Sequence, residues 1–86
     1  MNRPSLKFIA DSMYQEMDFV RRHFDEFSIA ELEYALRILE GEASQLSNFI
    51  ASSSKKNYYL IDTYTEWEDF NEEMMDRISG IRICVA

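Results

Sequence analysis

Apolar residues recur at alternating intervals of four and three along the first third of the chain. This spacing places them on one face of an α-helix, which completes a turn roughly every 3.6 residues. No polar residue interrupts the pattern, so it predicts an amphipathic helix over about residues 4–27. The members of this first stripe are Leu6, Ala10, Met13, Met17, Val20, Phe24 and Phe27.

A second stripe with the same spacing follows directly. Ser28 and Glu31 have the spacing of a capping box, in which each side chain accepts a hydrogen bond from the backbone amide of the other residue. The pattern predicts a helix over about 29–52 that continues through Gly41. Because a very short turn joins it to the first helix, we expect an antiparallel helical hairpin. The members of the second stripe are Ile29, Leu32, Leu36, Leu39, Ala43, Leu46 and Ile50.

The last third of the chain predicts a shorter, acidic helix. Residues 53–57 contain no apolar side chain and form the expected connection. Thr65 and Glu68 offer another capping box, and Gly80 is placed as the left-handed residue that ends a helix. We therefore expect a third helix over about 65–79.

The segments on either side of that helix are ambiguous. Periodicity does not separate a strand from a helical turn over four residues, so two short strands, about 58–61 and 81–85, are an alternative that we rank second. Otherwise residues 80–86 form a tail. The chain as a whole, 1–86, reads as one mostly α-helical domain.

The regularity of the two stripes is typical of helical bundles and coiled coils. Off-stripe apolar residues, including Phe8, Ile9, Phe19, Ile38 and Phe49, also need cover. We therefore expect two hairpins to pair into a four-helix homodimer, with a single third helix that covers both stripes as the alternative. The residues expected in this core or dimer interface are Met13, Met17, Val20, Phe24, Leu32, Leu36, Leu39 and Leu46.

Common catalytic machinery is missing from the sequence. His23 is the only histidine and there are two glycines, so the chain has no zinc ligand cluster, Glu-x-x-His motif, phosphate-binding loop or nucleophile elbow. A carboxylate pair acting as acid and base is the remaining catalytic alternative, and it needs a concave, partly desolvated site. We expect a protein that is not an enzyme and uses no cofactor or metal.

The sequence also indicates a compartment. It shows no apolar segment long enough for a signal peptide or a membrane span. Cys84 is the only cysteine, so there is no internal disulfide, which suits a reducing environment. We expect a cytoplasmic protein.

The net charge of −7 arises in one segment. Residues 62–76 contain seven acids and no Lys or Arg, whereas the rest of the chain has nine acids and nine bases. Such a segment is attracted to a basic surface on another protein. The candidate partner-binding residues are Asp62, Tyr64, Glu66, Glu68, Asp69, Glu72, Glu73 and Asp76.

A helix that begins at Thr65 compensates only part of this charge. Glu66, Glu68 and Asp69 would lie near the positive end of the helix dipole, whereas the acids that follow would not. Like charges four residues apart also repel one another on a helix. A solvated face that only keeps the protein soluble is the alternative interpretation.

These patterns favour a small acidic binding protein that docks its acidic helix on a basic, nucleic-acid-binding surface and thereby inhibits or modulates the partner. Carboxylates can compete with phosphate for the same Arg and Lys residues. By analogy of class alone, phage-type anti-defence inhibitors that imitate nucleic acid are compact acidic proteins of this size. The alternative is a dimeric structural or regulatory adaptor, or antitoxin-like module, that binds through its apolar hairpin. The acidic excess argues against direct binding of nucleic acid or of an anionic membrane.

Overall fold

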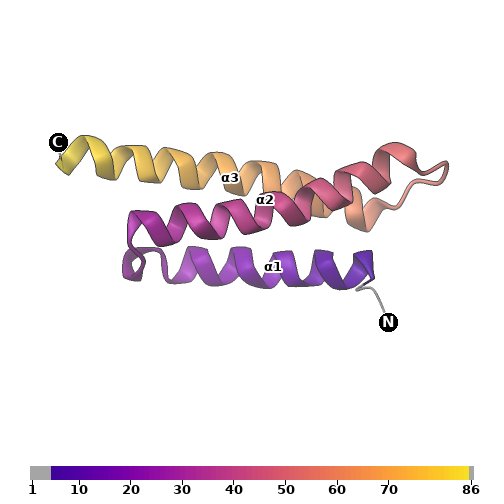
Figure 1. Ribbon diagram of the computed structural model, residues 1–86, viewed down its shortest axis with the longest axis horizontal. Coiled ribbons are helices and arrows are strands. Elements are labelled where there is room, and N and C mark those ends of the chain that lie inside the picture. The colour runs from indigo at the N-terminus through magenta and orange to yellow at the C-terminus, as the bar shows by residue number, and fades with distance from the viewer. Residues whose placement is uncertain (1–4, 86) are drawn as a thin grey trace.

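The computed structural model describes residues 5–85 and folds them into three α-helices (Figure 1). The helices are α1 (Leu6–Arg22), α2 (Ile29–Ser52) and α3 (Tyr58–Val85), and a short 3₁₀ turn, η1 (Phe24–Glu26), lies between α1 and α2. Consecutive helices run in opposite directions along the long axis of a molecule of 48 × 25 × 17 Å, and each helix contacts the other two. The prediction of a mostly α-helical chain is confirmed.

The first helix is shorter than the predicted range of 4–27. The Ser5 hydroxyl caps α1 by accepting a hydrogen bond of 3.0 Å from a backbone amide of the first turn. At the other end, the chain leaves the helical conformation at His23 and makes the turn η1. The predicted end of the helix was wrong because the chain reverses direction over the residues that follow Arg22. Phe24 nevertheless packs in the core and is only 5% exposed. Residue 4 lies outside the described residues.

The second helix begins at the capping box. The Ser28 amide donates to Glu31 Oε1 at 2.8 Å, and the Glu31 amide donates to Ser28 Oγ at 3.1 Å. Two of the amides that lack a partner within the helix are thereby satisfied. α2 then continues without a break through Gly41 and covers Ile29–Ser52.

The third helix is much longer than predicted, with 28 residues. The segments 58–61 and 81–85 are both helical, so the alternative of two short strands is wrong, and the expected tail is part of α3 as far as residue 85. The cap is Asn57, whose Oδ1 accepts a hydrogen bond of 3.2 Å from the Leu60 amide. Thr65 caps nothing, since its hydroxyl donates at 3.0 Å to the carbonyl four residues before it, within the helix. Residue 86 lies outside the described residues.

A buried polar residue explains why the start of α3 was missed. Thr63 lies within the apolar stripe and is fully buried. Its hydroxyl donates to the Tyr59 carbonyl at 2.7 Å, so the polar group is satisfied without leaving the helix. Once Thr63 is included, the core face of α3 begins two turns before Trp67. The buried residues of α3 are Leu60, Thr63, Trp67, Phe70, Met74 and Ile78.

This longer α3 covers both stripes of the other helices. All eight residues of the predicted core and dimer stripe are buried within one chain, and none is more than 6% exposed. A single third helix therefore does what we expected of a second hairpin. The stripe is therefore not available as a dimer interface. The homodimer stays a prediction, and it would have to form through another face of the molecule.

Replacing Gly80 by Ala is expected to stabilise the protein. Gly80 lies inside α3 rather than at its end, has no positive φ, and leaves open space where a Cβ would be placed. Ala in such a helix interior should raise the free energy of unfolding by about 0.5–1 kcal/mol, measured by urea unfolding. Gly41→Ala in α2, where the space is equally open, is the matched control and should give a similar gain. A loss of stability in Gly80→Ala alone would mean that this residue ends the helix after all.

Candidate functional site

The acids of α3 face away from the core. Five of them follow one another at intervals of three or four residues along the exposed side of the helix, opposite the buried stripe. We call this row of exposed side chains the acidic ridge. It consists of Asp62, Glu66, Asp69, Glu72 and Asp76. Glu68 is also exposed and lies beside the row.

The early start of α3 removes the expected compensation by the helix dipole. No acid lies in the first turn of α3. Glu66, Glu68 and Asp69 lie two or more turns inside the helix, where the dipole no longer favours anions. Their mutual repulsion is therefore not offset at the helix end, contrary to the prediction based on a cap at Thr65.

Glu73 differs from the other predicted partner-binding acids. Its Oε1 lies 3.1 Å from Arg21 Nη2, so the ion pair joins α3 to α1. The same Arg21 guanidinium lies 5.1 Å from the centre of the Phe70 ring. Among residues 5–85, none of the acids in the ridge lies within 4.0 Å of a Lys, Arg or His nitrogen. The structure thus assigns Glu73 to an internal contact and leaves the ridge open.

The aromatic residues of this segment pack inward. Trp67 and Phe70 are buried, with ring centres 6.5 Å apart. Tyr64 is half-buried and packs against the core, so only part of its ring is open to a partner. The ridge is consequently a carboxylate surface with little aromatic character.

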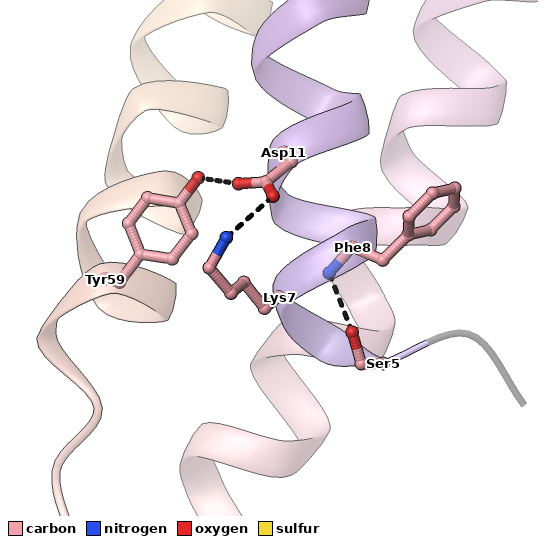
Figure 2. A network of polar contacts seen from close by, with 5 residues as sticks. All are labelled: Ser5, Lys7, Phe8, Asp11 and Tyr59. Carbon is pink, nitrogen blue, oxygen red and sulfur yellow. Dashed lines mark hydrogen bonds and ion pairs between the residues drawn. The ribbon is translucent and has the colours of Figure 1, made fainter.

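A polar network fastens the first turn of α3 to α1 (Figure 2). The Tyr59 hydroxyl donates to Asp11 Oδ1, and Lys7 Nζ donates to Asp11 Oδ2 at 3.0 Å. The hydrogen bond from Tyr59, and then that from Lys7, lowers the pKa of Asp11 below its usual value. Accepting that bond, Asp11 raises the pKa of Tyr59 to about 12. Tyr59 therefore serves an internal contact, although 39% of the residue is exposed.

A second surface lies between α1 and α2. An open groove of about 810 Å³ runs along these two helices, and α3 contributes no residue to its lining. The buried Val20 and Leu39 form part of its wall. Three large apolar side chains line it while remaining 54%, 63% and 43% exposed, namely Phe19, Tyr34 and Ile38.

Sequence reasoning missed this groove. Part of the signal is present in the sequence, because Phe19 and Ile38 are off-stripe residues that need cover. On α2 the sequence signal for the groove is a second apolar line of Ala30, Tyr34 and Ile38, spaced by four residues.

Two carboxyl groups meet beside the groove. Glu16 of α1 lines it, and Glu42 of α2 lies one turn beyond Ile38, within reach of the negative charge of Glu16. Glu42 Oε1 is buried and has no hydrogen-bond partner. Burial, followed by the negative charge of Glu16, raises the pKa of Glu42 to about 7. Glu42 is therefore partly protonated near neutral pH and ionises as the pH rises further.

Replacing Glu42 by Gln should flatten the pH dependence of stability. Folding raises the pKa of Glu42 from 4.5 to about 7. Its favourable contribution to the free energy of unfolding is therefore fully present below pH 4.5 and is lost as the pH rises through 7. Glu42→Gln keeps the shape, so we expect a gain in the free energy of unfolding of about 1 kcal/mol at about pH 8, after discounting for solvent screening at this half-exposed site. Urea unfolding between about pH 5 and 8 measures the effect. The exposed Glu40→Gln is the control, and an equal gain from it would contradict a specific role for the pair.

Within residues 5–85, no helix combines the length and the apolar character that crossing a bilayer requires. The same residues include no group of three or more His, Cys, Asp or Glu side chains placed to hold a metal ion. No protein-family model, no curated protein and no solved structure matches the chain. Over residues 5–85 the chain forms a three-helix bundle, with the acidic ridge on α3 and an apolar groove between α1 and α2.

Proposed function

We propose that this protein is a small non-enzymatic binding protein whose acidic ridge docks on a basic, nucleic-acid-binding surface of a partner protein and inhibits or modulates that partner. The observation that carries the proposal is the geometry of the ridge. Five carboxylates share one exposed side of α3, and among residues 5–85 none of them lies within 4.0 Å of a Lys, Arg or His nitrogen. Their mutual repulsion disfavours the helix that bears them.

The density of charge supports competition with nucleic acid. From Asp62 to Asp76 the helix rises about 21 Å at roughly 1.5 Å per residue. The ridge thus presents a carboxylate about every 5 Å, on the same order as one phosphate per about 3.4 Å of each strand of duplex DNA. Arg and Lys residues spaced to bind a phosphate backbone can therefore meet several carboxylates at once. By analogy of class alone, this is how anti-defence inhibitors that imitate nucleic acid act.

The experiment is affinity purification from the cells that produce the protein, with identification of the captured protein by mass spectrometry. The wild type is compared with an Asp69→Lys, Glu72→Lys, Asp76→Lys variant. A partner with a nucleic-acid-binding surface should be retained by the wild type and lost from the variant. Equal capture of the same partner by both proteins would contradict the proposal.

A second candidate function is favoured by a different observation. Phe19, Tyr34 and Ile38 leave an apolar surface exposed along α1 and α2. A structural or regulatory adaptor, antitoxin-like in kind and homodimeric, would bind through this surface rather than through the ridge. Light scattering of the wild type and of Ile38→Asp tests it, since a dimer that uses this face should dissociate in the variant.

We also propose that the protein acts in the cytoplasm. Cys84 is the only cysteine, so its fold needs no oxidising compartment.

A further inference from the structure

The groove between α1 and α2 lies where a fourth helix would pack against the bundle. Its lining runs over Ser12–Val20 on α1 and Ala30–Leu39 on α2, or about 14 Å along α2, and Phe27 closes it just before α2. Ala30 and Ala35 are small, which allows another helix to approach closely. Such grooves accept the apolar face of an amphipathic helix, with anchors spaced by three and four residues.

Charge decides between the possible occupants of the groove. Glu16 and Glu31 are the charged residues of its lining, and no Lys or Arg takes part. Glu31 is engaged in the capping box, whereas Glu16 faces Glu42, whose Oε1 has no partner. The residues three and four positions from Glu16 on α1 and from Glu42 on α2 are all uncharged. Beside this apolar surface, therefore, lies a carboxyl pair with which no Lys, Arg or His of residues 5–85 forms an ion pair within 4.0 Å.

A second copy of this chain fits the surface poorly. In a two-fold symmetric dimer the same patch lies on both sides of the interface. Glu16 belongs to the middle of the lined part of α1, so the two carboxyl pairs would be brought toward each other. Like charges that face one another across an interface cost several kcal/mol. A helix that carries a positive charge has the opposite effect.

We propose that the α1–α2 groove binds an amphipathic helix of another protein that carries a Lys or Arg within its apolar face, with the cation seated on Glu16 and Glu42. The Phe19, Tyr34 and Ile38 side chains close over the apolar residues of this helix. The cation supplies the donor that Glu42 Oε1 lacks. This surface is separate from the acidic ridge, so a variant of either one leaves the other intact.

Proton linkage predicts how the affinity of the groove for the cationic helix changes with pH. A cation beside the pair favours its ionised form, and therefore opposes the burial and the charge of Glu16 that raise the pKa of Glu42 to about 7. Binding of the cationic helix should release a proton near neutral pH and tighten as the pH rises from about 6 to 8. Self-association through the same face would instead tighten as the pH falls, because protonation removes the repulsion.

The probes are two synthetic helical peptides of about 18 residues, long enough to form a helix on the surface. Both have a Leu-rich apolar stripe and the same net charge. The first carries one Lys at the centre of the stripe, and the second carries norleucine there and its Lys on the solvent-facing side. Fluorescence anisotropy gives the Kd of each for the full chain, and urea unfolding shows that each variant is folded.

We expect the first peptide to bind wild type at least about tenfold more tightly than the second, as for a charge-assisted hydrogen bond in a desolvated site. In Glu16→Gln, Glu42→Gln the ratio should fall to about one. It should be unchanged in the Asp69→Lys, Glu72→Lys, Asp76→Lys variant, since none of those residues lines the groove.

Three results would overturn the proposal. One is equal affinity of the two peptides for the wild type, and another is no binding of either peptide. The third is a homodimer that Ile38→Asp dissociates and that tightens at low pH, which would assign the groove to a second copy of the chain.

Discussion

Replacing Leu39 by Asp is expected to abolish folding. Leu39 is fully buried in the core of a single chain. A carboxylate there lacks a partner and costs several kcal/mol, and the neutral acid still loses the packing of the leucine side chain, about 3–5 kcal/mol. A domain of this size has a total stability of about 4–13 kcal/mol. Far-ultraviolet circular dichroism should show loss of helix and no cooperative unfolding transition in urea.

Ile38, the residue before Leu39 in α2, provides the matched control. It is 43% exposed, so Ile38→Asp should lower the free energy of unfolding by about 1 kcal/mol or less and keep the protein folded. Together, the Leu39→Asp and Ile38→Asp variants distinguish a stripe buried within one chain from a stripe that forms a dimer interface. If the stripe were the interface between two hairpins, Leu39→Asp would yield a folded monomer, and that result would contradict the bundle described above.

Reversing three charges of the acidic ridge is expected to weaken binding of the basic partner by about a hundredfold. In Asp69→Lys, Glu72→Lys, Asp76→Lys, attraction is replaced by repulsion across the interface, which we take as about 3 kcal/mol in total. These side chains are exposed, so the variant should remain folded. Relief of the repulsion within α3 favours the same outcome. Calorimetric titration with the purified partner, at low and at high salt, measures the loss.

A second triple variant separates local charge from net charge. The control variant, Asp18→Lys, Asp25→Lys, Glu40→Lys, also reverses three acidic side chains, but at exposed positions outside α3. In both variants three reversals of two charges each bring the net charge from −7 to −1. The control should bind the partner within about threefold of wild type, with a similar dependence on salt. Equal weakening in the two variants would mean that only the overall charge matters.

The first two helices could be predicted from the sequence because local and tertiary preferences agree there. Ser28 and Glu31 satisfy each other's amides over a distance of three residues, so the start of α2 is encoded locally. Each apolar stripe has a single phase, which fixes the face that must be buried. The helical class and the residues of the core follow from this pattern.

Prediction of α3 failed where a local signal competed with packing. Thr65 and Glu68 imitate a capping box, and Gly80 imitates a helix end, although both lie inside the helix. Thr63 interrupts the apolar pattern but is satisfied by the helix itself. The continuous burial of α3 against the other two helices outweighs these weak signals, each of which is worth about 1 kcal/mol.

The charge of the candidate site could be predicted from the sequence, but not which acidic residues stay free and which form internal contacts. The segregation of seven acids into residues 62–76 is a property of the sequence. That Glu73 is paired follows only from the position of Arg21, which is 52 residues away in the chain. The early start of α3, which places the ridge beyond the reach of the helix dipole, was likewise visible only in the structure.

By itself, then, the sequence determined a helical chain with two apolar stripes and one acidic segment, because periodicity and charge are carried by neighbouring residues. Only the tertiary structure decided that α3 rather than a second hairpin covers the stripes. It also decided that the α1–α2 groove stays open beside the Glu16–Glu42 pair. Those outcomes depend on which helix faces meet, and the free energy of burying one face against another is set by residues far apart in the chain.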